Sequence, residues 1–351
     1  MRVIYDGVIE LLQSGGGCTV YFKELINNSC VNSFAGAIEY YCYVNQESSF
    51  SNEFKKNIMI TDVSNDIRIA ERWRDVDISL SLKEYSIFHS THYRLPLQKQ
   101  NTKIVTTVHD FTYEIFRKGP ARWMHSWQKF RAIKNSDLVI CVSQNTAGDL
   151  MRFCPIDRDK IRVVYNGVSE SYYPINGVDK SNSVVFVGAR GWYKNFALAV
   201  RTLQYFPYLN LSIVGGGPLT PEEAALLEEY IPGRYEWLGR VSDSGLNELY
   251  NKAYCLFYPS SYEGFGIPIA EAMRSGCPVV AVNTSSIPEV AGDAALLVKE
   301  ATVDAFKAAF TQLESESIRK KLIIDGLLQA EKFSWKKCYQ DTLRVYHELM
   351  E

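Results

Sequence analysis

The sequence predicts an α/β protein of two domains, each built on a parallel β-sheet. Its length of 351 residues suits two hydrophobic cores better than one. Short apolar runs alternate with helical patterns in both halves of the chain. In residues 254–289 a strand, a glycine-bearing loop, a helix and a second strand follow in order. This order places a helix N-terminus at the carboxyl end of a parallel sheet, where phosphates and sugar hydroxyls bind.

Composition excludes several classes of protein. Hydrophobic residues make up 46% and charged residues 22% of the chain, as in ordinary globular proteins, and the net charge of −2 gives no sign of a nucleic-acid partner. The 8 cysteines form no CxxC pair and no Cys/His cluster, which indicates a reducing compartment and no metal site. With no signal peptide at the start and no apolar run near 18 residues, we expect a cytoplasmic protein.

The first half begins with a strand at 2–5 and a loop that ends in Gly15, Gly16 and Gly17, followed by a helical pattern at 19–26. Strand, glycines and helix are a layout that holds phosphate, although the same glycines would also serve a tight turn. The loop lacks the GxGxxG spacing of a dinucleotide site, which disfavours a dehydrogenase. Residues 43–85 show no clear pattern, and we assign them no role.

A polar pair, His109 and Asp110, follows the β-branched strand at 103–108. The carboxyl end of such a strand is where ligand sites of α/β proteins gather, so both residues are candidates for ligand contact. A hydrogen-bonded structural histidine at a strand end is the alternative. His89 and His92 occupy a similar position after the preceding strand.

Residues 115–135 contain six basic side chains and no acidic ones, and Trp123, Trp127 and Phe130 fall on one face of a predicted helix. Two interpretations stay open. The helix could meet an anionic membrane or a lipid-linked acceptor. It could instead cover the strand at 137–142, with its aromatic side chains on the sheet and its lysines in water.

The second domain is expected to begin after a linker at 171–182, a segment rich in Pro, Gly, Asn and Ser. Its first strand ends at Gly188, and Arg190 and Lys194 stand before the next helix. Two cations beside a helix N-terminus can hold a pyrophosphate, Arg190 as a bidentate donor and Lys194 as a point charge. Two solvated cations are the alternative interpretation.

Two carboxylates of the 254–289 stretch, Glu263 and Glu271, lie eight residues apart. With the intervening GFGIPIA and the following EAMRSGCPVVAVNTSSIPEV, they resemble the donor-site signature of the retaining glycosyltransferases of family 4. An ordinary crossover with two solvated glutamates is the alternative. The start RVIYDG, the GGG loop and YEGFGIPIAEAM are most similar to bacterial mannosyltransferases of O-antigen and surface-polysaccharide synthesis.

The resemblance implies the GT-B fold, in which two Rossmann-like domains face each other across a cleft and the C-terminal helix crosses back to the N-terminal domain. The expected divisions are therefore an acceptor-side domain at 1–170, the linker, a nucleotide-sugar-binding domain at 183–335 and the returning helix at 336–351.

The resemblance also implies roles for single residues. His109 would contact the donor sugar, Asp110 would brace its loop or touch the acceptor, and Glu263 would bind sugar hydroxyls. The catalytic set is thus His109, Arg190, Lys194 and Glu263. Glu271 would accept hydrogen bonds from the ribose, and backbone groups would hold sugar, phosphate or base. The donor-binding set is Gly16, Gly17, Asp110, Gly188, Leu238, Gly239, Val241, Gly264, Phe265, Gly266, Ile267 and Glu271.

The implied reaction moves a hexose from a nucleotide-sugar to a hydroxyl of a glycan or lipid-linked oligosaccharide, with retention and without a metal or other cofactor. GDP-mannose is the favoured donor, and a UDP-hexose or another GDP-sugar is the alternative. The alternative enzymes with such a fold are a nucleotide-sugar 2-epimerase and a glycogen-phosphorylase-like enzyme. An inactive sugar-nucleotide-binding subunit of a polysaccharide assembly complex is the alternative outside enzymes.

Overall fold

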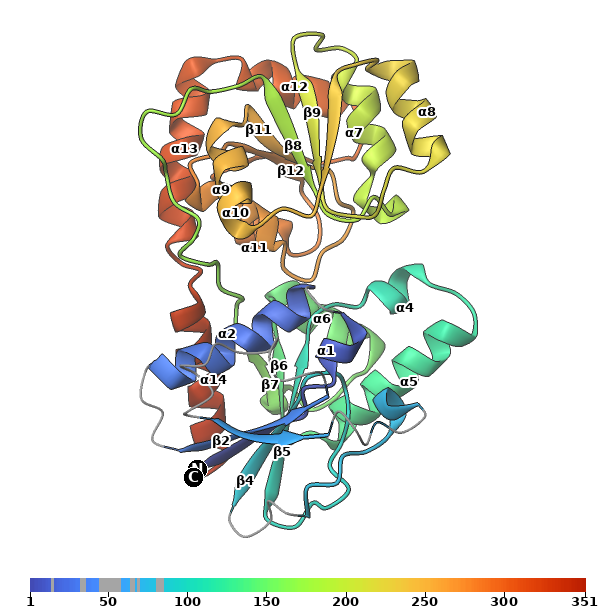
Figure 1. The fold of residues 1–351 in the computed structure, drawn as a ribbon, viewed down its shortest axis with the longest axis vertical. Coiled ribbons are helices and arrows are strands. Elements are labelled where there is room, and N and C mark those ends of the chain that lie inside the picture. Colours follow the sequence, from blue (N-terminus) through green and yellow to red (C-terminus); the bar gives the residue numbers. More distant parts are fainter. Residues whose placement is uncertain (14–15, 32–35, 44–57, 64–66, 68–69, 80–84) are drawn as a thin grey trace. The chain divides into compact units, whose positions relative to one another are not determined.

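The computed structural model describes residues 1–351 except 14–15, 32–35, 44–57, 64–66, 68–69 and 80–84 (Figure 1). The chain divides into two compact units. The first consists of Met1–Gly167 with Trp335–Glu351, and the second of Val168–Ser334. Each unit contains one parallel sheet with helices packed on it, which confirms the predicted fold class.

The first unit has a seven-stranded sheet in the order β3-β2-β1-β4-β5-β6-β7, and every pairing is parallel. Its central strands are apolar runs buried along their length, as expected when helices cover both faces. The strand order reverses between β1 and β4, so the residues that follow these two strands occupy the switch point where ligands bind. The strands are β1 (Arg2–Tyr5), β2 (Ala37–Cys42), β3 (Ile58–Asp62), β4 (Ser86–Ser90), β5 (Thr102–Val108), β6 (Leu138–Cys141) and β7 (Ile161–Val163).

The C-terminal helix α14 (Trp335–Glu348) belongs to the first unit, where it packs against α2 (Gly17–Val31). Tyr346 anchors α14 to the sheet, because the Tyr346 hydroxyl lies 2.5 Å from His89 Nδ1 on β4 and 2.9 Å from Tyr5 Oη on β1. His89 is therefore a structural residue. The described residues of this unit also form α1 (Ile9–Leu12), α4 (Thr112–Phe116), α5 (Pro120–Asn135) and α6 (Gln144–Phe153), with 3-10 turns η2 (Glu71–Trp73) and η4 (Arg158–Lys160).

Helix α5 buries a polar face and exposes an aromatic one. Trp123 is 77% and Trp127 56% exposed. Lys129 is fully buried, and its ammonium donates to the Glu114 carboxylate at 2.8 Å and to the Asp110 carbonyl at 2.9 Å. The interpretation that the tryptophans pack on the sheet while the lysines stay in water is therefore wrong for Trp123, Trp127 and Lys129. Lys129 can be buried because its ion pair with Glu114 compensates the loss of hydration.

The second unit has a six-stranded parallel sheet in the order β10-β9-β8-β11-β12-β13, which reverses between β8 and β11. Helix α7 packs against α8 and α12, whereas α10 packs against α9, α11 and α13. The strands are β8 (Ser183–Val187), β9 (Asn210–Val214), β10 (Tyr235–Gly239), β11 (Cys255–Tyr258), β12 (Val279–Val282) and β13 (Leu296–Val298). The helices are α7 (Phe196–Leu203), α8 (Pro221–Tyr230), α9 (Asp243–Lys252), α10 (Ile267–Arg274), α11 (Ile287–Ala291), α12 (Val303–Leu313) and α13 (Glu316–Ala330), with the 3-10 turn η5 (Trp192–Lys194).

The segment 171–182, expected as a linker, belongs to the second unit. Asn247 and Asn251 of α9 bind its backbone: Asn247 Oδ1 accepts from the Tyr173 N–H at 3.1 Å, and Asn251 Oδ1 accepts from the Ile175 N–H at 2.7 Å. These side chains satisfy backbone groups that would otherwise lack partners, so the segment is anchored. The chain crosses between the units at Gly167–Val168 and at Ser334–Trp335.

Candidate active site

Two serines that follow β12 form hydrogen bonds with the backbone of the loop between β11 and α10. Ser285 Oγ accepts a hydrogen bond from the Glu263 N–H at 2.9 Å. Ser286 Oγ lies 2.9 Å from the Glu263 carbonyl and 3.0 Å from the Phe265 carbonyl. Gly266 caps α10 with φ of +94°, a conformation that favours glycine. The Glu263 backbone is thus positioned before any ligand arrives.

Glu263 and Lys194 form a buried ion pair. The Lys194 ammonium donates to the Glu263 carboxylate and, at 3.3 Å, to the Tyr258 hydroxyl. The two charged side chains are only 11% and 13% exposed. Asn195 ties the two segments together, because its amide donates to the Pro259 carbonyl at 2.8 Å. The structure therefore brings together two predicted site residues that follow different strands, Lys194 after β8 and Glu263 after β11.

Glu271 lies on α10 in a pocket of hydroxyl groups. The Tyr250 hydroxyl donates to its carboxyl at 3.4 Å. Burial raises the pKa of Glu271 to about 8, the Asp243 carboxylate adds to this rise, and the Tyr172 and Tyr250 hydroxyls oppose it. A carboxyl with this pKa is largely protonated at neutral pH, so it can donate as well as accept hydrogen bonds with a diol.

Arg190 is bound to the loop after β9 and to α8. Its Nε lies 2.9 Å from Glu223 Oε2, and its other nitrogens donate to the carbonyls of Gly215 at 3.2 Å, Gly217 at 2.7 Å and Pro218 at 3.0 Å. A predicted pair of phosphate-binding cations is therefore divided between two carboxylates, Glu223 for Arg190 and Glu263 for Lys194.

Glycines line the carboxyl edge of the second sheet where β8, β9 and β10 end. Gly188 has φ of +119° and donates its N–H to the Val214 carbonyl at 2.9 Å. A Cβ on Gly215 would lie 3.6 Å from the Gly188 backbone, and the Gly215 N–H donates to the Gly239 carbonyl at 2.6 Å. Leu238 flanks this edge and is partly exposed. A ligand can therefore approach the backbone closely here.

Val241 follows the glycine edge at the N-terminal side of α9 and is partly exposed. Gly264 and Ile267, on either side of the Gly266 cap, are also partly exposed. Phe265 differs from them, because its ring is buried against Phe333 with centroids 5.4 Å apart. Only its backbone is therefore a candidate for ligand contact.

In the first unit, His109 follows β5 and its ring packs edge-on against Tyr21, with centroids 5.0 Å apart. Burial lowers the pKa of His109 to about 4, so the imidazole is neutral at physiological pH. Its Nε2 is buried and has no hydrogen-bond partner among the residues that the structure describes. A buried imidazole nitrogen without a protein partner is a candidate for ligand contact.

Asp110 braces the turn after β5, because its Oδ1 accepts from the Thr112 N–H at 2.9 Å. Gly17 is the first residue of α2, and the Gly16 carbonyl accepts from the Val20 N–H at 3.1 Å. A Cβ added to Gly17 would meet no atom within 4 Å, so this glycine leaves open space at the helix start. Gly15 lies outside the described residues.

Sequence reasoning missed the side chains that surround the two glutamates: Tyr172, Tyr250, Tyr258, Ser285 and Ser286. The serines carried a usable signal, since they follow a buried strand at the sheet edge where ligand sites gather. The tyrosines carried none, because a tyrosine in an apolar run is usually a core residue.

Two further searches cover the described part of the chain. No group of three or more His, Cys, Asp or Glu side chains is placed to hold a metal ion there. Across the same residues, no helix combines the length and apolarity needed to cross a bilayer.

Comparison with known proteins agrees with the fold. Residues 170–326 match the family "Glycosyl transferases group 1", and residues 50–172 match "Glycosyltransferase Family 4". O-antigen chain mannosyltransferase B of Escherichia coli is 30% identical over 291 residues, which is 76% of this chain and 76% of that protein. O-antigen chain mannosyltransferase RfbU of Salmonella typhimurium is 28% identical over 250 residues, 69% of each chain.

Solved structures show the same architecture. Sucrose-phosphate synthase from Thermosynechococcus elongatus superimposes with a TM-score of 0.78 at 17% identity, covering 99% of this chain and 98% of that one. WaaG, a glycosyltransferase involved in lipopolysaccharide biosynthesis, gives a TM-score of 0.70 at 13% identity, covering 98% and 99%. The fold and these matches define a GT-B glycosyltransferase. The chain belongs to glycosyltransferase family 4.

Proposed function

We propose that this glycosyltransferase moves mannose from GDP-mannose to a hydroxyl of a glycan or lipid-linked oligosaccharide, with retention, in bacterial surface-polysaccharide synthesis. The observation that carries the proposal is the Lys194–Glu263 pair on a preorganised loop, with Glu271 eight residues further along. The mannosyl donor is favoured by the Escherichia coli and Salmonella relatives, whose names state mannosyl transfer. A UDP-hexose or another GDP-sugar is the alternative donor.

Each part of the donor has a proposed set of partners. Glu271 would bind the ribose diol, and Lys194 and Arg190 the diphosphate. Glu263 would bind sugar hydroxyls, and the glycine edge at Gly188 and Gly239 would let the nucleotide approach the backbone. In the first unit, His109 is proposed to contact the transferred sugar, since its buried Nε2 has no protein partner in the described residues.

The proposed reaction takes a front-face route. The acceptor oxygen bonds to the anomeric carbon as the bond to the donor phosphate breaks, and a phosphate oxygen takes the acceptor proton. Lys194, Arg190 and the N-terminus of α10 would stabilise the charge on the leaving nucleoside diphosphate. A double displacement needs an ionised, unengaged carboxylate. Glu263 is paired with Lys194 and Glu271 has a raised pKa, so neither suits that role.

The face of α5 that carries Trp123, Met124 and Trp127 is proposed to rest on an anionic membrane surface. These three side chains are 77%, 51% and 56% exposed. Residues 115–135 contain no acidic residue. Exposed aromatics among cations favour the interface of an anionic bilayer. Arg117 and Lys118 lie just before α5 and are exposed, and Arg122 in its first turn is partly exposed.

A nucleotide-sugar panel tests the donor. We expect GDP-mannose to raise the melting temperature most and to be hydrolysed or transferred. The product should keep the anomeric configuration of the donor when it is examined by NMR. A larger shift with UDP-hexoses would replace the mannosyl assignment. Binding without any hydrolysis or transfer would favour an inactive nucleotide-binding subunit, and a covalent glycosyl-enzyme on any side chain would contradict the front-face route.

A further inference from the structure

A cavity of about 350 Å³ lies in the first unit between the 3-10 turn η2 and helices α4 and α5. Its walls come partly from η2, in a segment to which the sequence assigned no role, and partly from α5, and none of them comes from the β11–α10 loop or its partners. Cavities of this size accommodate small ligands. The lining residues are Arg72, Trp73, Tyr113, Pro120, Ala121, Met124 and His125.

Arg72 brings a positive charge to this cavity. Its guanidinium lies 4.5 Å from the centre of the Trp73 ring, and its buried Nε has no hydrogen-bond partner in the described part of the chain. No carboxylate among those residues pairs with Arg72. A buried donor without a partner is costly, so a ligand acceptor at this point would be stabilising.

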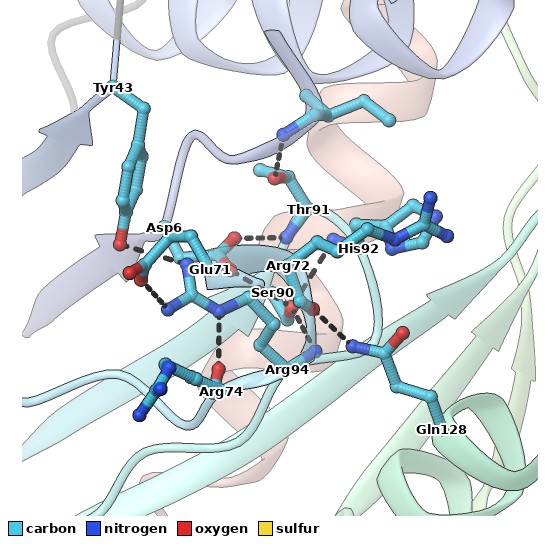
Figure 2. Close-up of polar contacts among 11 residues, drawn as sticks. Asp6, Tyr43, Glu71, Arg72, Arg74, Ser90, Thr91, His92, Arg94 and Gln128 are labelled. Carbon is cyan, nitrogen blue, oxygen red and sulfur yellow. Dashed lines mark hydrogen bonds and ion pairs between the residues drawn. The ribbon is translucent and has the colours of Figure 1, made fainter. Parts of the chain in front are cut away.

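The neighbouring carboxylate, Glu71, is already engaged. Arg94 is fully buried and donates to Glu71 Oε1 at 2.5 Å, to the Tyr43 hydroxyl at 2.8 Å and to the Arg74 carbonyl at 2.7 Å (Figure 2). Arg72 follows Glu71 in the chain, but it is Arg94 that forms the ion pair with Glu71. The Gln128 side-chain amide donates a hydrogen bond to the Arg72 carbonyl at 2.5 Å (Figure 2). This bond fixes the backbone from which the Arg72 side chain extends.

Two histidines, His125 in the cavity wall and His92 beside it, offer ring nitrogens for hydrogen bonds. His92 and His125 have ring centroids 6.0 Å apart, and His125 stacks on Tyr113 at 4.1 Å. Both Nδ1 atoms are buried without a hydrogen bond among the described residues. The nearest carboxylate, Glu114, is 3.7 Å from His125 Nδ1 and is held at 2.8 Å by the buried Lys129. Burial, Arg72 and His125 together lower the pKa of His92 to about 3.

The remaining walls are apolar. Trp73, Tyr113, Pro120 and Met124 line the cavity, and Met124 is also 51% exposed, next to the exposed Trp123 on the same helix. An apolar path therefore leads from the cation at Arg72 to the face of α5 that carries Trp123 and Trp127. A ligand that fits must carry an anionic group next to an apolar chain.

We propose that this cavity binds the phosphate of a lipid-linked acceptor, with Arg72 on the phosphate and the first carbons of the lipid on Trp73 and Met124. The assignment rests on the proposed function for its meaning, because the lipid phosphate would carry the glycan that receives the sugar. Binding of the lipid phosphate alone requires no donor, so it can be measured separately from transfer.

Calorimetry on the full-length protein without nucleotide tests the proposal, with geranyl phosphate as the probe and geraniol and inorganic phosphate as its two halves. We expect saturable one-to-one binding of geranyl phosphate, and at least tenfold weaker binding of either half. Arg72→Gln should weaken geranyl phosphate binding about 10- to 100-fold, the equivalent of one charge-assisted hydrogen bond. Equal affinity for inorganic phosphate would overturn the lipid assignment, and no binding of geranyl phosphate would overturn the site.

Two more variants separate the site from general effects. Arg152→Gln is the matched control, because Arg152 also lies over an aromatic ring, at 5.0 Å from Phe153, and is exposed on α6; its affinity should equal that of the wild type. Met124→Glu places a carboxylate at an exposed position of the rim, where the fold tolerates it, and should abolish binding. Unchanged affinity in Met124→Glu and Arg72→Gln would overturn the proposal.

The proposed function fails separately. If GDP-mannose and the other nucleotide-sugars neither bind nor react while geranyl phosphate binds through Arg72, the glycosyl-transfer assignment falls and the subsite stands. If transfer to a soluble glycan proceeds while geranyl phosphate does not bind, the subsite falls and the transfer assignment stands.

Discussion

Replacing Glu263 with glutamine should separate nucleotide binding from sugar transfer. In the wild type the Lys194 charge is engaged by a carboxylate, and both side chains are nearly buried, with 11% and 13% exposure. Glutamine keeps the shape and removes the charge. The Lys194 ammonium then becomes available to a diphosphate, and the sugar loses a charged hydrogen-bond acceptor.

The magnitudes follow from the burial of the pair. An ion pair this buried leaves an uncompensated charge when one partner is removed, which costs about 3 kcal/mol of stability. A GDP phosphate bound to Glu263→Gln would compensate part of the uncompensated Lys194 charge. The charge-assisted hydrogen bond that it accepts contributes about 1.5–3 kcal/mol, equivalent to roughly 10- to 100-fold in the Kd for GDP. Transfer should fall by a similar factor for the lost contact with the sugar. We therefore expect lower stability, tighter GDP binding and slower transfer together.

Urea unfolding, GDP calorimetry and a transfer assay measure the three quantities. Glu300→Gln is the control, since Glu300 is exposed and should change none of them. Adding Lys194→Met to Glu263→Gln should restore stability and remove the gain in GDP affinity. Loss of GDP binding in Glu263→Gln, or a gain that survives in the double variant, would refute the assignment of Glu263 to the sugar and Lys194 to the phosphate.

Three other predictions concern the rest of the site and the helix face. Arg190→Ala should weaken GDP binding about tenfold or more and abolish turnover, whereas Glu223→Gln should strengthen binding by freeing Arg190 from its ion pair; equal affinities in calorimetry would contradict the phosphate role. The folded-state pKa of Glu271 is raised from 4.5 to about 8, so its contribution to stability is fully present below pH 4.5 and is lost as pH rises through 8. Glu271→Gln should remove this fall, which for a shift of this size is about 3–5 kcal/mol, in denaturant titrations at pH 5 and pH 9. Replacing Trp123 and Trp127 with serine should abolish sedimentation with anionic vesicles and leave transfer to a soluble acceptor unchanged; retained sedimentation would place the membrane contact elsewhere.

Many helices and strands of the second unit could be predicted from the local sequence pattern. The strand at Cys255–Tyr258, the helix after Gly266 and its end before Gly276 follow from apolar periodicity, proline and glycine, and the structure has the strand at 255–258 and the helix at 267–274. The anchoring of the expected linker at 171–182 could not be predicted from its composition, which resembles that of a free loop. Asparagine side chains on α9, more than 70 positions away, bind its backbone, and no local pattern reveals such partners.

The sequence by itself determined the two parallel sheets, the glycine turns and the spacing of Glu263 and Glu271, because these depend on residues that are near one another in the chain. Only the tertiary structure decided which charges are paired. Lys194 pairs with Glu263 across 69 positions, and the buried Lys129 pairs with Glu114 while the tryptophans of α5 stay exposed. Arg94 pairs with Glu71, and no carboxylate of the described residues pairs with Arg72. The physical reason is that the free energy of a buried charge depends on its nearest opposite charge, and folding brings that partner from a distant part of the chain.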